Sequence, residues 1–218
     1  MSKILVEASV ETLDEAVAAE EAGADRVELC ANLAEDGLTP ESAAVASVVE
    51  HLRIPVFTIV RPRTGDFVYD EDELRRMLRD VRAAGSAGLA GVVTGILSAD
   101  GTVDAARTRA LVEAAAPLPV TFHRAFDRVA DTARALETLI DAGIVRVLTS
   151  GGAATALEGA NTIAALVRQA GDRIVVLAGG GVRAHNVRDL IARTGVREVH
   201  SRFVGATAMG LLVDAVAM

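Results

Sequence analysis

Carboxylates and a histidine lie near the ends of short apolar runs, in positions suited to acid–base chemistry. Glu7 and Glu28 belong to two such runs, and His123 lies near the end of another, with Asp127 four residues later. A carboxyl group crowded by a second one keeps its proton to higher pH, so it can act as a general acid or base. We therefore take Glu7, Glu28, His123 and Asp127 as candidate catalytic residues.

Strand alternation places the two glutamates on one face. Residues two apart in a strand point the same way, so Glu7 shares a face with Ser9, and Glu28 with Cys30. Neighbouring strands would bring both glutamates close to Arg61. Two interpretations remain open: Glu28 and Arg61 form a buried structural ion pair, or two crowded carboxylates share a proton that serves a substrate.

Positive charge and glycine-rich turns follow other apolar runs. Arg61-Pro62-Arg63 places two guanidinium groups in a turn stiffened by proline, which suits two-point binding of a carboxylate or phosphate. Glycines after strands expose backbone N–H groups that can hold an anion. A solvated loop and tight packing at a barrel rim would account for the same residues. The candidate substrate-binding residues are Arg61, Arg63, Asp66, Arg124, Ser150, Gly151, Gly179, Gly180 and His200.

Cys30 is the single cysteine of the chain, and its thiolate would be a soft ligand suited to Cu(I). Imidazoles such as those of His123 and His200 could complete a copper site. The alternative is that Cys30 is simply a small buried apolar residue, because the chain has no Cys-x-x-Cys or His-x-x-x-His spacing. One cysteine permits no internal disulfide.

The elements that must position these residues alternate along the whole chain. Short β-branched runs and amphipathic segments follow one another, which predicts βα units around a parallel sheet. The clearest helix spans Asp70–Ala84, with Asp70 as its amino-terminal cap and Leu74, Met77 and Val81 on one face. The predicted strands are Ile4–Ser9, Arg26–Cys30, Val56–Arg61, Gly91–Leu97, Val120–Arg124, Arg146–Ser150, Ile174–Gly179 and Glu198–Arg202.

A repeated glycine predicts closure of the sheet. A glycine stands four residues before a valine of every second strand, at Gly23, Gly88, Gly143 and Gly195. Glycine just past a helix end accepts the left-handed backbone that ends the helix. Two of the other strands begin after Pro55 and Pro119. The chain thus reads as four βαβα quarters, which predicts a (β/α)8 TIM barrel, one domain over residues 1–218, with its ligand site at the carboxyl ends of the strands.

Composition excludes several partners. The net charge is −8 and the sequence pI about 5.0, so neither nucleic acid nor an anionic membrane surface is expected as a partner. Hydrophobic residues make up 51% of the chain and charged residues 24%, as in a globular protein with a sizeable core. Met1-Ser2-Lys3 leads into a strand pattern without a long apolar leader, so a soluble, cytoplasmic protein is expected.

Several segments resemble the CutC family, and the likeness runs from about Leu5 to His200. It implies a TIM-type barrel in the cytoplasm, a homo-oligomer such as a homodimer, and the family's historical association with copper homeostasis and Cu(I) binding. The matching segments are Val27-Glu28-Leu29-Cys30, Gly37-Leu38-Thr39-Pro40, Arg61-Pro62-Arg63-Thr64-Gly65-Asp66-Phe67, Thr121-Phe122-His123-Arg124-Ala125-Phe126-Asp127, Leu148-Thr149-Ser150-Gly151 and Ala178-Gly179-Gly180-Gly181-Val182.

One departure from the family pattern bears on copper. Family members proposed to bind copper usually carry a cysteine on the first strand beside the one on the second strand. Here Ser9 stands at the first-strand position, while Cys30 matches the second. A two-thiolate copper site would therefore have only one of its two sulfurs in this chain.

Three functional hypotheses follow. The first is a copper-handling protein, with Cys30 as the metal ligand and His123 or His200 assisting. The second is a barrel enzyme that acts on a small anionic metabolite, phosphorylated or carboxylated, by acid–base catalysis. The third is a barrel that binds a regulator or a protein partner and performs no chemistry.

Overall fold

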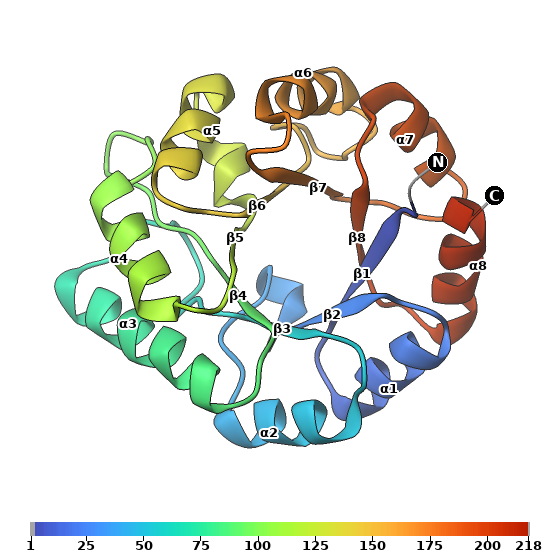
Figure 1. Ribbon diagram of the computed structural model, residues 1–218, viewed down its shortest axis with the longest axis horizontal. Coiled ribbons are helices and arrows are strands. Elements are labelled where there is room, and N and C mark those ends of the chain that lie inside the picture. Colours follow the sequence, from blue (N-terminus) through green and yellow to red (C-terminus); the bar gives the residue numbers. More distant parts are fainter. Residues whose placement is uncertain (1–2, 218) are drawn as a thin grey trace.

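Eight parallel strands close into a barrel in chain order, and β8 pairs with β1 to complete it. Helices surround this ring of strands on every side (Figure 1). The predicted (β/α)8 barrel is confirmed. The protein is described by a computed structural model that covers residues 3–217. Met1, Ser2 and Met218 lie outside the described residues, and with them the expectation about the amino-terminal leader.

The elements alternate strictly between strand and helix, with two short 3-10 helices in the loops. The strands are β1 (Leu5–Val10), β2 (Arg26–Leu29), β3 (Val56–Ile59), β4 (Gly91–Thr94), β5 (Val120–Phe122), β6 (Arg146–Thr149), β7 (Val175–Gly179) and β8 (Glu198–Arg202). The helices are α1 (Leu13–Glu21), α2 (Ser42–His51), α3 (Glu71–Ser86), α4 (Ala105–Ala115), α5 (Thr132–Asp141), α6 (Ala160–Ala170), α7 (Val187–Thr194) and α8 (Ala206–Ala217). The 3-10 helices are η1 (Leu33–Glu35) and η2 (Arg124–Arg128).

Several strands end earlier than predicted, so the residues expected at their last positions lie in loops. Arg61 follows β3, and its backbone N–H donates to the hydroxyl of Thr39. His123 follows β5 and caps η2, accepting a hydrogen bond from the backbone N–H of Ala125. The Thr39 hydroxyl thus replaces a sheet partner at Arg61, whereas the His123 N–H still donates to the Thr94 carbonyl of β4 at 2.9 Å and its ring starts η2. The apolar pattern of the strand reveals neither contact.

Helix α3 begins where the sequence predicts, because its first turn carries a complete capping box. The Asp70 carboxylate accepts from the Glu73 N–H at 2.8 Å, and the Glu73 carboxylate accepts from the Asp70 N–H at 2.9 Å. Leu74, Met77 and Val81 are buried against the barrel. The helix runs to Ser86, two residues beyond the predicted end.

The repeated glycines follow α1, α3, α5 and α7, as predicted. Their φ angles are 92° at Gly23, 78° at Gly88, 85° at Gly143 and 73° at Gly195, all in the left-handed region. A side chain with a Cβ atom rarely adopts this conformation, whereas glycine does so without strain. Each glycine therefore lets the chain leave a helix and enter the next even-numbered strand directly.

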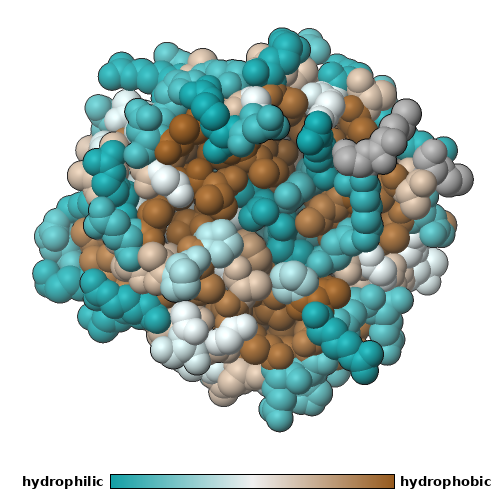
Figure 2. Space-filling model, viewed as in Figure 1, coloured by the Kyte–Doolittle hydropathy of each residue, from teal (hydrophilic) through white to brown (hydrophobic). Residues whose placement is uncertain are grey.

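Apolar side chains fill the layer between strands and helices, whereas charged side chains enter the barrel interior. Val6, Ala8 and Val27 are fully buried among the core residues, while the alternating residues Glu7 and Arg26 meet inside the barrel. Viewed down the barrel, hydrophilic residues lie at the centre of the visible face, next to hydrophobic surface (Figure 2). Among residues 3–217, no helix is long and apolar enough to cross a membrane.

Candidate active site at the carboxyl ends of the strands

A cavity of about 530 Å³ lies at the carboxyl ends of the strands, a size suited to a small molecule. Five arginines and three acidic residues line it, although the chain as a whole has a net charge of −8. The charged lining residues are Arg61, Arg124, Arg128, Arg183, Arg202, Glu28, Asp36 and Asp127, and His123 and His200 join them. The fold thus concentrates positive charge at one end of an acidic protein.

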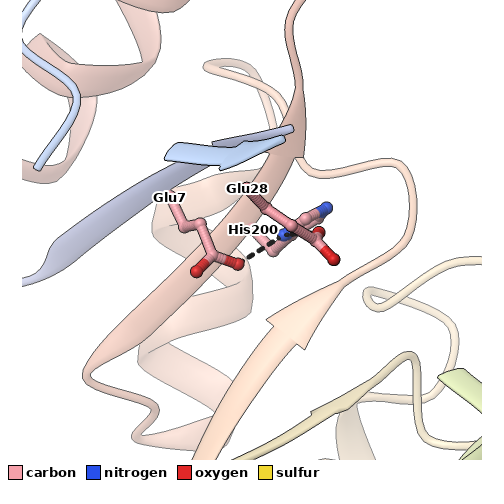
Figure 3. Close-up of side chains that lie close together, drawn as sticks. All are labelled: Glu7, Glu28 and His200. Carbon is pink, nitrogen blue, oxygen red and sulfur yellow. Dashed lines mark hydrogen bonds and ion pairs between the residues drawn. The ribbon is translucent and has the colours of Figure 1, made fainter. Parts of the chain in front are cut away.

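Glu7, Glu28 and His200 form a compact cluster at this site, from β1, β2 and β8. Their ligand atoms all lie within 4.8 Å of one another. The Nδ1 atom of His200 is 2.7 Å from a Glu7 oxygen and 3.7 Å from a Glu28 oxygen. Figure 3 shows the Glu7 carboxylate directed at His200, with Glu28 beside the ring. Glu28 and His200 line the cavity, and Glu7 lies behind them.

The two glutamates have opposite pKa shifts. Burial disfavours the charged form of Glu7, but the hydrogen bond to His200 and the charge of Arg26 outweigh it and lower its pKa to about 2. Burial and the neighbouring charge of Glu7 raise the pKa of Glu28 to about 7, against the opposing charge of His200. Burial alone would lower the pKa of His200, but the hydrogen bond to Glu7 and the charges of both glutamates outweigh burial and raise it. One carboxyl group thus stays ionised while the other takes up a proton near neutral pH.

A buried ionic network supports Glu7 from the opposite side. The Arg26 guanidinium donates to Glu7 at 2.5 Å and to Glu198 at 2.7 Å, and Arg146 donates to Glu198 at 2.8 Å. Both guanidinium groups lie over the ring of Phe57, at 4.9 and 5.5 Å. Sequence reasoning missed this layer. The available signal was alternation, because Arg26 and Glu198 each stand two residues before an inward-facing residue of the cluster.

Arg61 lines the cavity but does not pair with Glu28, so one of the two open interpretations, a buried Glu28–Arg61 ion pair, is wrong. Its guanidinium donates to the backbone carbonyls of Glu35, Gly37 and Gly65, at 2.8, 3.0 and 3.3 Å. Because Arg61 follows β3 rather than ending it, the side chain reaches loops instead of the neighbouring strand. It therefore ties the loops after β2 and β3 together.

Arg63 and Asp66 lie outside the cavity lining. The Arg63 guanidinium donates to Glu73 of α3 at 2.5 Å and to Asp66 at 2.9 Å. It also donates to the carbonyl of Val68 at 2.7 Å. These contacts turn Arg63 towards α3, so Arg61 and Arg63 do not converge on one point.

His123 lines the cavity as a neutral imidazole. Burial and the charge of Arg61 lower its pKa to about 3. Its Nδ1 atom accepts from the Ala125 N–H at 3.1 Å, which leaves the ring proton on Nε2. Within residues 3–217, that buried Nε2 has no hydrogen-bond partner. Gly95 leaves room for the ring, because a Cβ there would lie 2.5 Å from it.

Asp127 binds the turn after β6. Its carboxylate accepts from the Thr149 hydroxyl at 2.5 Å and from the backbone N–H groups of Ser150 and Gly152, each at 3.1 Å. The Arg124 guanidinium donates to it at 2.8 Å and also reaches the Ser150 hydroxyl. Asp127 therefore joins η2 to the β6 turn, and Ser150 contributes to that joint rather than to the cavity surface.

Other atoms lie close to the backbone of the candidate glycines, where a side chain would collide with them. A Cβ on Gly151 would lie 2.5 Å from the Gly159 carbonyl, and one on Gly179 would lie 2.5 Å from Leu148. Gly151 and Gly179 are not part of the cavity lining, whereas Gly180 is. The requirement for glycine at the first two positions thus comes from packing.

Cys30 is buried and lines the cavity beside Ser9. Burial and the carboxylate of Glu28 raise the pKa of its thiol well above the ordinary value. In the described part of the chain, the one group of three metal-capable side chains is Glu7, Glu28 and His200, and Cys30 does not belong to it. Oxygen and imidazole donors do not share the preference of Cu(I) for sulfur.

The cavity also contains charged residues that sequence reasoning missed. Arg183 follows the glycine run after β7, and Arg202 ends β8 two residues after His200. Arg128 is the last residue of η2, and Asp36 follows η1. Arg202 could have been found by strand alternation, whereas loop residues have no periodicity that predicts their direction.

Comparisons with known proteins agree on one family. A sequence model described as the CutC family matches residues 4–205. A family protein CutC of Mesorhizobium japonicum is 50% identical over 196 residues, covering 90% of this chain and 76% of that protein. One from Xanthomonas campestris pv. campestris is 51% identical over 203 residues, covering 93% and 85%.

A solved structure extends the likeness to three dimensions. The crystal structure of a CutC protein from Streptococcus agalactiae, whose name refers to copper homeostasis, is 35% identical. It superimposes with a TM-score of 0.86 and covers 90% of this chain and 97% of that one. The family match, the two relatives and this structure together place the chain in the CutC family.

Proposed function

We propose that the protein is an enzyme that binds a small anionic metabolite in the cavity and transfers a proton to or from it through Glu28. The observation that carries this proposal is a carboxyl group with a pKa of about 7 in a cavity lined by five arginines. Such a group can both give and take a proton near neutral pH. The arginines supply the attraction for an anion.

The neighbouring residues have distinct roles in this proposal. Glu28 is the acid or base, and His200 lies beside it, with Nδ1 3.7 Å from a Glu28 oxygen, so that the charge of the ring acts on the Glu28 carboxyl group. Glu7 is a positioning residue, because it accepts from Nδ1 of His200 and leaves Nε2 as the second titratable atom of the ring. Arg26 holds Glu7 ionised through a 2.5 Å contact. Arrangements of this kind orient a histidine in many acid–base sites.

Neutral His123 contributes a different chemistry. A neutral imidazole with a proton on Nε2 can donate a hydrogen bond to a carbonyl oxygen while the ring stays uncharged. Taking a proton from the carbon next to a carbonyl breaks the C–H bond and moves its electron pair towards that oxygen. Glu28 would accept the proton and His123 would stabilise the oxygen, which supports isomerisation as the reaction class. In an aldol-type cleavage, Glu28 would instead take the proton of the hydroxyl group β to the carbonyl, and the electron pair of the breaking C–C bond would move towards the same oxygen.

Copper handling receives less support from the geometry. The family includes a protein named for copper homeostasis, and Cys30 lines the cavity. Among the described lining residues, however, Cys30 supplies the one sulfur atom, and Ser9 stands beside it. Neighbouring carboxylates disfavour the thiolate that Cu(I) requires. The residues present therefore do not fit a Cu(I) site, and copper binding by Cys30 stays a prediction.

A thermal-shift screen with phosphorylated and carboxylated metabolites tests the binding step. A ligand at one hundred times its dissociation constant stabilises a protein by roughly 2.7 kcal/mol, which gives a measurable rise in melting temperature. We expect a shift for at least one anion, reduced in Arg202→Ala and retained in Arg79→Ala, an exposed arginine on α3. The absence of any shift, or an equal shift in both variants, contradicts the proposal.

The chemical step is then tested with each stabilising anion in deuterated water. We expect the wild type to convert the anion or to exchange one of its C–H protons for deuterium, observed by proton NMR. Glu28→Gln should slow this reaction by roughly 100-fold or more, since general acid–base catalysis contributes about that factor. Binding without any reaction would instead support a barrel that binds a regulator and performs no chemistry, and equal reaction rates in both proteins would contradict the role of Glu28.

A further inference from the structure

Two adjacent turns of the barrel rim each contain two consecutive glycines with positive φ angles. After β6, Gly151 and Gly152 have φ angles of 72° and 73°. After β7, Gly180 and Gly181 have φ angles of 107° and 71°. Successive backbone N–H groups in a turn can form a concave site for an anion. The two turns differ in what lies against those N–H groups.

The β6 turn already holds an anion, supplied by the chain itself. The Asp127 carboxylate accepts from the N–H groups of Ser150 and Gly152, both at 3.1 Å, and from two hydroxyl groups. The side chain of Asp127 is only 7% exposed. The turn is therefore a carboxylate site with an internal occupant, held by the N–H groups of Ser150 and Gly152, while the Gly151 N–H donates to the Thr149 hydroxyl at 2.8 Å.

The β7 turn has no such occupant. Within residues 3–217, no acceptor forms a hydrogen bond with the N–H group of Gly180 or Gly181. Both glycines line the cavity, so a ligand there can reach them. A Cβ on Gly180 would lie 3.0 Å from the Ser150 side chain, so the narrow space favours glycine at this position.

Two arginines flank the β7 turn and keep donors available. The guanidinium carbon of Arg124 lies 3.6 Å from the position of a Cβ on Gly180. Arg124 uses Nε and Nη2 for Asp127 and Ser150, which leaves Nη1. Arg183 uses Nη1 for Val182 and Ser201, which leaves Nε and Nη2. Among the described residues, Arg183 has no carboxylate within ion-pair distance.

We propose that the β7 turn, defined here by Gly180 and Gly181 with Arg124 and Arg183, is a binding site for a phosphoryl group. Two guanidinium groups and one backbone turn supply donors to the same cavity, and a phosphoryl group offers three terminal oxygens to accept from them. A carboxylate offers two oxygens in one plane, which a single guanidinium satisfies. This inference rests on the proposed function and specifies its substrate class as a phosphate ester.

An NMR titration of the 15N-labelled chain with inorganic phosphate tests the site at constant pH and ionic strength. We expect the amide signals of Gly180 and Gly181 to move with a common saturation curve. The Gly152 amide is the internal control, because Asp127 already binds it. Arg183→Ala should weaken binding roughly ten-fold or more, as expected for a lost hydrogen bond between charged groups. Arg79→Ala should bind phosphate like the wild type.

Three results would overturn the phosphoryl site. They are stationary Gly180 and Gly181 signals throughout the titration, unchanged affinity in Arg183→Ala, and an equal response to acetate, which would indicate a carboxylate site. Failure here is distinguishable from failure of the proposed enzyme. Glu28→Gln should bind phosphate normally while losing proton transfer. If the wild type binds phosphate but the Glu28 carboxyl group titrates near its ordinary pKa, the phosphoryl site is supported and the acid–base role of Glu28 is contradicted.

Discussion

At the residue scale, two glutamates on adjacent strands have pKa values shifted in opposite directions. Glu7 meets Arg26 and His200 directly, so its negative charge is matched on two sides. Glu28 is equally buried, but its contact with His200 is 3.7 Å and no arginine donates to it among the described residues. The surroundings of each carboxylate, rather than residue type, decide which one carries a proton.

Glu28 should make the stability of the protein depend on pH. Its pKa is raised from 4.5 to about 7 in the folded chain, so the folded state binds the proton more tightly than the unfolded state. The free energy of unfolding should therefore fall as pH rises from about 4.5 to about 7. The raised pKa of His200 acts in the same direction, because its stabilising charge is lost as pH rises.

The variant Glu28→Gln should flatten this dependence and gain stability relative to the wild type above about pH 7. Urea unfolding of both proteins at several pH values measures the difference. Equal slopes of unfolding free energy against pH would show that Glu28 ionises normally in the folded protein.

Cys30 should not bind Cu(I) tightly. The thiol is buried beside carboxylates that disfavour its thiolate, and the cavity offers no second sulfur among its described lining residues. An anaerobic titration against a strong Cu(I) chelator is the measurement. Wild type and Cys30→Ser should compete equally poorly, and strong competition by the wild type alone would restore the copper-handling hypothesis.

At the element scale, local rules predicted the strands and helices better than their ends. The glycines after four helices and Asp70 as the amino-terminal cap of α3 are local signals, and both were confirmed. Strand ends depend on side-chain contacts with nearby backbone, which the strand pattern does not encode. The Thr39 hydroxyl accepts from the Arg61 N–H after β3, and the His123 ring accepts from the Ala125 N–H at the start of η2. The predicted β5 was therefore two residues too long.

Asp127 should behave as a structural residue of the β6 turn. Replacement by Asn removes the charge and one of the two acceptor oxygens that serve Thr149, Ser150, Gly152 and Arg124. We expect Asp127→Asn to lower the free energy of unfolding by roughly 2–3 kcal/mol. Chemical denaturation measures this loss, with Asp172→Asn, an exposed residue, as the control. An unchanged stability would contradict the structural role.

At the scale of the whole molecule, charged side chains pair inside the barrel, and an apolar layer between the strands and helices surrounds them. Alternation predicted that polar residues enter the interior, and this part of the site could be read from the sequence. The partners could not, because Arg61 was considered for Glu28, whereas Arg61 donates to loop carbonyls and Arg26 contacts Glu7. The contacts of Arg26 and Arg146 with Glu198 depend on barrel closure, which brings β2 and β6 to β8. The homodimer stays a prediction.

Glu198 is the centre of the network that closes the barrel interior. It bridges Arg26 and Arg146, so its neutralisation leaves two buried guanidinium groups with one carboxylate fewer. We expect Glu198→Gln to destabilise the protein by about 3–5 kcal/mol, the usual cost of breaking a buried ion pair. Glu137→Gln, at an exposed pair with Arg173, should have little effect. Similar melting temperatures for the two variants would contradict this account.

The central claim, that Glu28 is a proton-transfer group in an anion-binding cavity, is tested most directly by its carboxyl 13C chemical shift. The signal is assigned by its loss in Glu28→Gln and followed through a pH titration of the wild type. The structure predicts a midpoint near pH 7, where the pKa is raised to about 7 by burial and the charge of Glu7. A midpoint near the ordinary value of 4.5 would contradict the account.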